Sequence, residues 1–275
     1  MEKILKKILK YKKEDICIIS DFDATLTQAL KDDGSRGSDS FTVYPNNPEL
    51  LGEEYLTQTN KLFVKYYAIE QDPKISFKEK EKAMVEWWRK EFELYNTYKL
   101  NQEIFIKIIQ NHLIELKNRV PEFLKITHSL NIPTILFSAG VYNLIHGFLE
   151  KINCDYSNVH VVSNIYCFDS KGYFTGTKGD VIHSLNKTFS ELSHLPVYSE
   201  LKTKKVCLVL GDSVSDMKMV EGGNFEEVIS VGFLNKLPGE KEYEERLKAH
   251  TEAFDIVLDG REDFSKIIDL LKDIK

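Results

Sequence analysis

Short apolar runs and longer amphipathic stretches alternate along most of the chain. The first apolar run, Ile16–Ile19, consists of four residues that favour a strand and leads directly into polar residues. Similar runs predict five more strands, at residues 133–140, 159–163, 206–210, 227–232 and 254–260. Helical spacing of apolar residues follows most of these runs. This alternation predicts an α/β fold with a doubly wound, mainly parallel sheet and helices on both faces.

The segment between the first two predicted strands has a different pattern. Amphipathic spacing predicts three helices there, at residues 48–72, 76–95 and 101–113. Because no convincing buried strand occurs between them, we expect an all-helical insertion. We therefore predict a core formed by residues 1–30 and 120–275, and a helical cap domain formed by residues 31–119.

Local signals mark where several elements begin and end. Pro73 is expected to stop the first helix of the insertion, and Pro121 suits the first position of the next helix. A hairpin is predicted over residues 165–177, with its turn at Ser170–Gly172. Near the N-terminus, four apolar residues fit one face of a short helix that docks on the core: Ile4, Leu5, Ile8 and Leu9.

Composition narrows the possible partners and compartments. The chain has 275 residues and a formal net charge of −6, which argues against a nucleic-acid partner because such proteins are usually basic over the contacting face. No apolar run is long enough to span a membrane, and the lysine-rich N-terminus lacks the apolar region of a secretory signal. The cysteines have no zinc-site spacing and are expected to be buried, reduced thiols: Cys17, Cys154, Cys167 and Cys207. We expect a monomeric cytoplasmic protein.

The first strand delivers two carboxylates at its carboxyl end. Asp21 and Asp23 follow Ser20 in the string DFDATLT. Ligands bind at this end of the strands in open α/β sheets. There, Asp21 can bind a hard cation and can attack phosphorus, while Asp23 can protonate the leaving oxygen and later take a proton from water. A D-x-D triplet alone arises by chance roughly once in a chain of this length, so the other groups must support this interpretation.

The most specific motif is the string GDSVSD, directly after the apolar run 206–210. It places Asp212 at a strand end and Asp216 in the first turn of a predicted helix, 214–221. Such a string occurs by accident about once in a few hundred chains of this length. The alternative explanation is simple helix capping by Ser213, but capping does not require an aspartate before the serine. If Asp212 and Asp216 meet Asp21 and Asp23, four carboxylates need a cation, and their oxygen ligands favour Mg²⁺.

Two further segments carry groups that can hold a phosphate. Ser138, Ala139 and Gly140 are expected to end a strand and open a helix, where a hydroxyl and backbone N–H groups can bind phosphate oxygens. A plain helix cap explains this string at least as well. Lys187, in SLNKT, is a candidate second cation if a helix face carries it inward, although a lone lysine is usually a solvated surface group.

Taken together, this order of groups resembles the haloacid dehalogenase superfamily. The segments KYYAIEQDP, MVEWW, FSAG, VVSN, KGDVIHSLNK and LGDSVSDMKM are similar to those of the cytosolic 5′-nucleotidase III family, the pyrimidine 5′-nucleotidases. The similarity runs from about Ile16 to the C-terminus and is weakest between Gln28 and Lys61. It implies a Rossmann-like core with a helical cap, a magnesium cofactor, and hydrolysis of nucleoside 5′-monophosphates to nucleoside and phosphate.

The resemblance also implies a role for each matching residue. Asp21 becomes the nucleophile and a metal ligand, and Asp23 the acid/base group and a ligand through its carbonyl. Asp212 binds magnesium and Asp216 supports it. The phosphate is held by three residues: Ser138, Ala139 and Lys187.

The resemblance places Glu70, at the end of KYYAIE, in the cap facing the nucleobase. A carboxylate there can accept hydrogen bonds from an exocyclic amine or a ring N–H, although a glutamate at a helix end is more often solvent-exposed. Four aromatic residues can stack on a base or simply pack the cap helices together: Tyr66, Tyr67, Trp87 and Trp88. The chain departs from the family at Glu91, where relatives tend to have a serine, and in the loop after Thr27. Both departures bear on base preference.

Three other functions compete with this one. A nucleotidase of the same family that prefers 7-methylguanosine monophosphate would use aromatic stacking and Glu70 to bind a cationic base. A signalling receiver would be phosphorylated on an aspartate at a strand end, but receivers are much shorter and need no group like Asp23. A catalytically silent binding protein is disfavoured because all the expected chemical groups are present.

Overall fold

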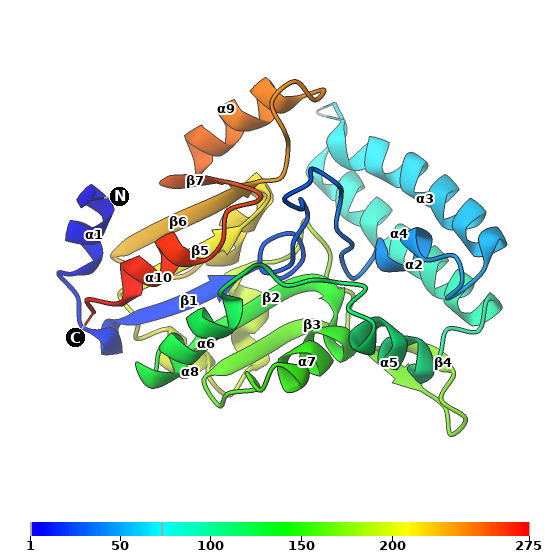
Figure 1. The fold of residues 1–275 in the computed structure, drawn as a ribbon, viewed down its shortest axis with the longest axis horizontal. Helices are drawn as coiled ribbons and strands as arrows, with labels where there is room; N and C mark the ends of the chain where they lie inside the picture. The colour runs from blue at the N-terminus through cyan, green and yellow to red at the C-terminus, as the bar shows by residue number, and fades with distance from the viewer. Residues whose placement is uncertain (1, 73, 275) are drawn as a thin grey trace.

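A single seven-stranded sheet forms the centre of the protein (Figure 1). We describe a computed structural model, which covers residues 2–72 and 74–274. The strands are β1 (Ile16–Ser20), β2 (Thr134–Val141), β3 (Val159–Phe168), β4 (Phe174–Lys178), β5 (Val206–Gly211), β6 (Glu227–Leu234) and β7 (Ile256–Asp259). Their spatial order is β4-β3-β2-β1-β5-β6-β7, and every neighbouring pair is parallel except β3 and β4. The predicted α/β fold with a mainly parallel sheet is confirmed.

Strand β1 lies in the middle of the sheet and is buried on both faces. It pairs with β2 on one side and with β5 on the other, where Cys17 lies opposite Cys207. Ile16 and Ile18 belong to one hydrophobic core, whereas Cys17 and Ile19 belong to the second. Because the chain order reverses between β1 and β5, the carboxyl ends of these two strands border the crevice where open α/β sheets bind ligands.

Helices cover both faces of the sheet. The larger core includes residues of α1 (Glu2–Ile8), α6 (Val120–Ser129), α7 (Tyr142–Lys151) and α10 (Ser265–Leu271). The second core includes residues of the 3₁₀ helices η2 (Phe189–His194) and η3 (Val214–Val220) and of α8 (Tyr198–Leu201). Helix α9 (Tyr243–Ala253) packs on β6, β7 and η3. The remaining short helix is η1 (Lys13–Asp15). None of the helices in the described part of the chain is long and apolar enough to cross a membrane.

Four helices precede α6 in the insertion between β1 and β2. They are α2 (Val43–Asn46), α3 (Glu53–Gln71), α4 (Phe77–Thr97) and α5 (Gln102–Gln110). Helices α3 and α4 pack against each other beyond the sheet edge, whereas α5 lies against α7 of the core (Figure 1). The two connections to the sheet meet at an isolated bridge between Thr27 and Leu116. The exact division into a core and a cap of residues 31–119 stays a prediction.

Several element boundaries differ from the prediction. Helix α3 begins at Glu53 rather than near residue 48, because the chain turns at Gly52, whose φ is +92°. Pro73, which was expected to stop this helix, lies outside the described residues. Strand β3 runs from Val159 to Phe168. The predicted strand at 159–163 and the first arm of the predicted hairpin are therefore one continuous strand, which pairs with β4. The expected α-helix at 214–221 is a 3₁₀ helix.

The four cysteines are free, as predicted. Cys17, Cys154 and Cys207 are buried. The prediction of burial was wrong for Cys167, which is exposed because it lies on the outward face of β3 near the hairpin.

Candidate active site

Asp21 lies at the carboxyl end of β1. Its backbone N–H donates to the carbonyl of Leu210 at 2.9 Å, so the sheet pairing with β5 continues one residue beyond the strand. The residue is only 6% exposed. Its Oδ1 accepts a hydrogen bond from Lys187 Nζ at 2.9 Å. The strand therefore fixes this carboxylate in position beside a cation.

The motif after β5 brings two more aspartates to the same place. Asp216 Oδ2 accepts hydrogen bonds from the backbone N–H groups of Asp212 and Ser213, at 3.1 and 3.0 Å. Gly211 is required here, because a Cβ at this position would lie 2.5 Å from Asp216 Cβ. One carboxylate oxygen from each of Asp21, Asp212 and Asp216 lies within 4.8 Å of the others. The predicted meeting of the two strand ends is thus present in the structure.

This cluster is electrostatically costly. Burial raises the pKa of Asp21 to about 6, even though Lys187 opposes that rise. Burial raises the pKa of Asp212 as well, and the neighbouring carboxylates of Asp216 and Asp21 add to the effect. Lys187 also bonds Asp216 Oδ1 at 2.7 Å. Burial alone would lower the pKa of Lys187, but the two carboxylates raise it above its ordinary value. One lysine for three acids leaves a deficit of positive charge that suits a divalent cation.

Asp23 faces a different environment from Asp21. Ser40 donates to it twice, from its backbone N–H to Oδ1 at 2.9 Å and from its hydroxyl to Oδ2. Burial and the nearby carboxylate of Asp39 raise the pKa of Asp23 to about 8, while the Ser40 hydrogen bonds oppose this. The raised pKa favours the protonated form of Asp23, which is the form that a general acid needs. Sequence reasoning missed Ser40 and Asp39, which lie in the polar loop after Thr27.

The segment Ser138–Gly140 is not the helix start that was predicted. Strand β2 continues to Val141, its pairing with β3 is irregular between Phe137 and Val141, and α7 begins only at Tyr142. Ser138 Oγ accepts the Gly140 N–H at 2.9 Å. Ala139 and Gly140 nevertheless line the cavity described below, and Ser138 lines an adjoining pocket together with Lys187 and Asp216. The segment is a bulged strand end, which brings its backbone close to Asp23.

Lys187 reaches the site from a loop and not from the expected helix face. Asparagine side chains shape this loop. Asn164 bonds both the N–H and the carbonyl of Ile182, at 2.9 and 2.8 Å, and Asn186 bonds the carbonyl of Val181 at 2.9 Å. Lys187 is 3% exposed as a result. Its predicted position next to the aspartates is correct, but its local structure was predicted wrongly.

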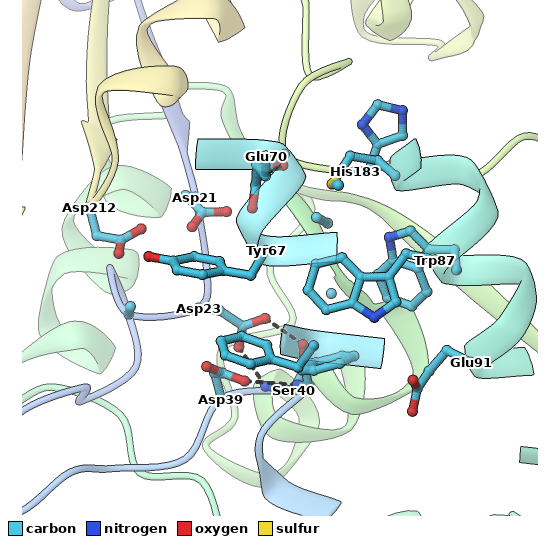
Figure 2. Close-up of a pocket in the computed structure, with 18 residues that line it drawn as sticks. Asp21, Asp23, Asp39, Ser40, Tyr67, Glu70, Trp87, Glu91, His183 and Asp212 are labelled. Atoms are coloured by element: carbon cyan, nitrogen blue, oxygen red, sulfur yellow. Dashed lines mark hydrogen bonds between the residues drawn. The ribbon is translucent and has the colours of Figure 1, made fainter. Parts of the chain in front are cut away.

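A cavity of about 380 Å³ extends from the aspartates to the helices of the insertion (Figure 2). In Figure 2, Asp21, Asp23 and Asp212 lie at one end, and Trp87 and Glu91 lie at the other. Aromatic and apolar side chains from α3, α4 and the loop before α2 line its walls: Phe41, Phe63, Tyr67, Met84, Trp87 and Trp88. Tyr66 does not line the cavity but stacks behind Trp87, with ring centroids 5.9 Å apart. The cavity is therefore polar at the end with the aspartates and aromatic at the opposite end.

Two glutamates line the part of the cavity formed by the insertion. Glu70, in the last turn of α3, accepts a hydrogen bond from the Ser184 hydroxyl of the core. Glu91, on α4, is fully buried and accepts hydrogen bonds from Tyr55 at 2.6 Å and Thr59 at 3.0 Å. The structure thus places the predicted Glu70 at the cavity, together with Glu91, the position where the chain departs from its relatives.

Contacts across the cavity mouth join the insertion to the core. Arg246 on α9 donates to the hydroxyl of Tyr67 on α3 at 2.9 Å, and Ser184 bonds Glu70 as described above. The ammonium of Lys218 also lies 4.0 Å from the ring centre of Phe77. These contacts lie at the rim of the cavity, whereas Tyr95 near the end of α4 packs on Tyr166 and Phe174 of the core.

Solved structures with this fold include phosphoserine phosphatases. The phospho-aspartyl intermediate analogue of phosphoserine phosphatase aligns over 95% of this chain and 100% of its own, with a TM-score of 0.56 and 20% identity. At this identity the likeness concerns the fold alone. The chain therefore has the fold of phosphoserine phosphatase, with a cluster of aspartates at the carboxyl ends of β1 and β5.

The family follows from closer relatives. The family model Pyrimidine 5′-nucleotidase (UMPH-1) matches residues 24–275, and the chain belongs to this family. The 7-methylguanosine phosphate-specific 5′-nucleotidase of Homo sapiens is 31% identical over 94% of this chain and 84% of its own, and that of Drosophila melanogaster is 33% identical over 94% and 79%. The crystal structure of cytosolic 5′-nucleotidase IIIB bound to cytidine is 32% identical, with a TM-score of 0.83 over 99% of this chain and 90% of its own. These relatives are named as 5′-nucleotidases, which are phosphoric monoester hydrolases, and the predicted family and enzyme class are confirmed.

Proposed function

We propose that this protein is a magnesium-dependent 5′-nucleotidase that converts nucleoside 5′-monophosphates to nucleoside and phosphate through an aspartyl-phosphate. One observation carries the proposal: the carboxylates of Asp21, Asp23 and Asp212 lie together at one end of a cavity whose other walls are aromatic. The names of the relatives support the substrate class.

The chemistry follows from the roles of the two aspartates. A carboxylate oxygen of Asp21 attacks phosphorus, the bond from phosphorus to the nucleoside O5′ breaks, and Asp23 gives its proton to that oxygen. Asp23 then takes a proton from water as the water oxygen attacks the phosphorus of the aspartyl-phosphate, which releases inorganic phosphate. Lys187, Ser138 and Ala139 line the pocket around Asp21, and we propose that they hold the phosphoryl oxygens. Lys187 offsets the charge that develops on those oxygens.

The donor set fits Mg²⁺. Asp21, Asp212 and Asp216 offer three carboxylate oxygens in a compact group, and the carbonyl of Asp23 is a fourth candidate ligand. When bound, the ion would reduce the repulsion between the Asp21 carboxylate and the anionic phosphate. Lys187 pairs with Asp21 at 2.9 Å and with Asp216 at 2.7 Å, so the cluster does not rely on the ion alone for positive charge.

The base is expected to occupy the aromatic end of the cavity. The family description and the neighbour bound to cytidine support pyrimidine nucleotides. A second candidate, 7-methylguanosine monophosphate, is supported by the names of the human and Drosophila relatives and by a pocket with two carboxylates and two tryptophans, which suits a cationic base. In both cases residues 31–119 serve as the cap that supplies the base pocket. We further propose that the protein acts as a cytosolic monomer, in line with the relative from Caenorhabditis elegans named putative cytosolic 5′-nucleotidase 3.

A nucleotide panel tests the proposal. Phosphate release from CMP, UMP, AMP and 7-methyl-GMP is measured with and without magnesium. Hydrolysis that needs magnesium and favours CMP and UMP, or 7-methyl-GMP, is the expected result. Equal rates on all four nucleotides contradict the proposed base pocket, and rates that do not change without magnesium contradict the mechanism.

Glu70→Ala probes the base pocket separately. Glu70 lines the cavity and is proposed to accept a hydrogen bond from the base, so the variant is expected to raise the KM for nucleotides by about tenfold, the value of one hydrogen bond to a charged group. The KM for p-nitrophenyl phosphate, which has no nucleobase, provides the reference. An equal rise for both substrates would show that Glu70 does not contact the base.

A further inference from the structure

Asn235 directly follows β6 and connects three segments that meet beside the aspartates. Its side-chain Nδ2 donates to the carbonyl of Ala24 at 2.9 Å and to Asp212 Oδ2 at 3.4 Å. Its own backbone carbonyl accepts a hydrogen bond from Arg36, in the polar loop of the insertion, at 2.8 Å. Ala24 comes directly after Asp23 in the loop that follows β1, and Asp212 follows β5. One amide group therefore joins the two strand ends that carry the carboxylates of the site.

The neighbours of this amide fix its orientation. The Ala24 carbonyl and the ionised carboxylate of Asp212 are both acceptors, so only the NH₂ group of Asn235 can face them, with one hydrogen for each. Its Oδ1 is buried and has no hydrogen-bond partner among the described residues, which costs free energy. The side chain has little room to turn, because a Cβ at Gly260 would lie 2.3 Å from Oδ1. The amide therefore leaves its own oxygen unpaired while it donates to the two acceptors.

Ala24 has a backbone conformation that needs such support. Its φ is +59°, in the left-handed region that is unfavourable for residues with a side chain. The chain is held on both sides of this residue: the N–H donates to Thr27 Oγ1 at 2.7 Å, and the carbonyl accepts from Asn235 at 2.9 Å. Strained residues persist only where their surroundings hold them. Because Ala24 directly follows Asp23, relaxation of this turn would move the Asp23 carboxyl.

We infer that Asn235 is a positioning residue that fixes the Asp212 carboxylate and the turn after Asp23 relative to each other. The inference rests on the proposed function and identifies a residue outside the aspartate cluster on which cation binding by Asp212 depends. Asn235 lines neither the cavity nor the adjoining pocket around Asp21, so it acts through Asp212 and Ala24.

The physical reason is preorganisation. A carboxylate that rotates freely loses conformational freedom when it binds a cation, whereas one that a donor already holds loses less. Arg36 contributes to this order, because it pairs with Glu240 at 2.6 Å while it holds the backbone carbonyl of Asn235. The Asn235 side chain is thus itself fixed by a segment of the insertion.

Asn235→Leu tests the inference, because leucine keeps the branching of the side chain and removes both N–H donors. Binding of Mg²⁺ to the metal-free protein is measured by isothermal titration calorimetry. We expect the Kd for Mg²⁺ to rise about tenfold, as is typical when a group that holds a metal ligand is removed. At saturating Mg²⁺, kcat for a nucleoside monophosphate should also fall about tenfold, because the turn after Asp23 relaxes. The Ki of the product nucleoside should stay close to the wild-type value, because Asn235 does not line the cavity that is proposed to hold the base.

Asn158→Leu is the matched control. Asn158 is also a buried asparagine whose Nδ2 donates twice, to the carbonyl of Ile132 at 2.8 Å and to Thr127 Oγ1 at 3.3 Å. It precedes β3 and so lies at the amino end of the parallel strands, away from the aspartates. Both variants are expected to lower the midpoint of denaturant unfolding, but only Asn235→Leu should weaken Mg²⁺ binding and lower kcat.

Asn235→Ala removes the same donors without filling their space, and it should show the same losses even if Asn235→Leu does not fold. An unchanged Kd for Mg²⁺, or an unchanged kcat, in a folded Asn235 variant overturns the inference. Equal losses in Asn158→Leu would also overturn it, because they would show a general effect of destabilisation. A wild type that binds no Mg²⁺, or that hydrolyses no nucleotide in its presence, would instead overturn the proposed function.

Discussion

The proton on Asp23 should depend on Ser40. The Ser40 hydroxyl donates to Asp23 Oδ2, and this bond lowers a pKa that burial and Asp39 raise to about 8. A hydrogen bond to a charged group is worth roughly 1.5–3 kcal/mol, and one pKa unit corresponds to about 1.4 kcal/mol. Ser40→Ala removes this bond and keeps the backbone bond from the same residue. We expect the pKa of Asp23 to rise by roughly one to two in the variant.

The measurement is the dependence of kcat/KM on pH with a nucleoside monophosphate. Phosphoryl transfer to Asp21 needs Asp23 protonated, so the rate should fall on the alkaline side near pH 8 in the wild type. In Ser40→Ala this limb should move to higher pH by roughly one unit or more. With p-nitrophenyl phosphate the limb should be shallow in both proteins, because nitrophenolate leaves readily without a proton.

Ser38→Ala provides the matched control for this experiment. Ser38 lies in the same loop and accepts a hydrogen bond from Asn46, not from any group in the cavity. Its alkaline limb should coincide with that of the wild type. An unmoved limb in a folded Ser40→Ala variant would refute the role of Asp23 as the general acid.

Three other predictions follow from the same site. Asp21→Asn removes the nucleophile and should abolish turnover, and rapid acid quenching with labelled substrate should trap no phosphoenzyme. A chelator should abolish hydrolysis while circular dichroism stays unchanged, because Lys187 still pairs with Asp21 and Asp216; added Mg²⁺ should restore the rate, and activity that survives chelation would refute the metal requirement. Burial in the folded protein raises the pKa of Glu91 from 4.5 to about 7. The protonated side chain therefore contributes fully to the free energy of unfolding below about pH 4.5, and this contribution is lost as the pH rises through 7. Between pH 5 and 8, denaturant unfolding should show Glu91→Gln gaining roughly 2–3 kcal/mol relative to the wild type, and parallel pH profiles would contradict this.

The sequence predicts the parts of the site that local signals determine. Ile16–Ile19 forms a buried strand because of its apolar run, and strand ends in a parallel sheet meet at one edge, so Asp21 and Asp212 were expected to be neighbours. The position of Asp216 close to Asp212 follows from the four-residue spacing of the motif. The structure contains the three predicted placements, those of Asp21, Asp212 and Asp216.

Other features depend on contacts between distant segments and leave little trace in the sequence. Ser40 reaches Asp23 from a polar loop whose path is set by tertiary packing, and Lys187 is positioned by asparagine bonds rather than by a helix. The 3₁₀ form of η3 likewise has no clear sequence signal. Glu91 had a detectable signal, since an acid three or four residues from Trp87, Trp88 and Tyr95 occupies an apolar helix face.

The bonds from Arg246 to Tyr67 and from Ser184 to Glu70 have a kinetic consequence. The nucleoside formed in the cavity is larger than phosphate, and both bonds lie at the rim of that cavity. We expect both bonds to open when the nucleoside leaves. The speed of this opening then sets an upper limit on kcat that is the same for every leaving group, and slow opening would keep released nucleoside in the pocket as an inhibitor of the next cycle.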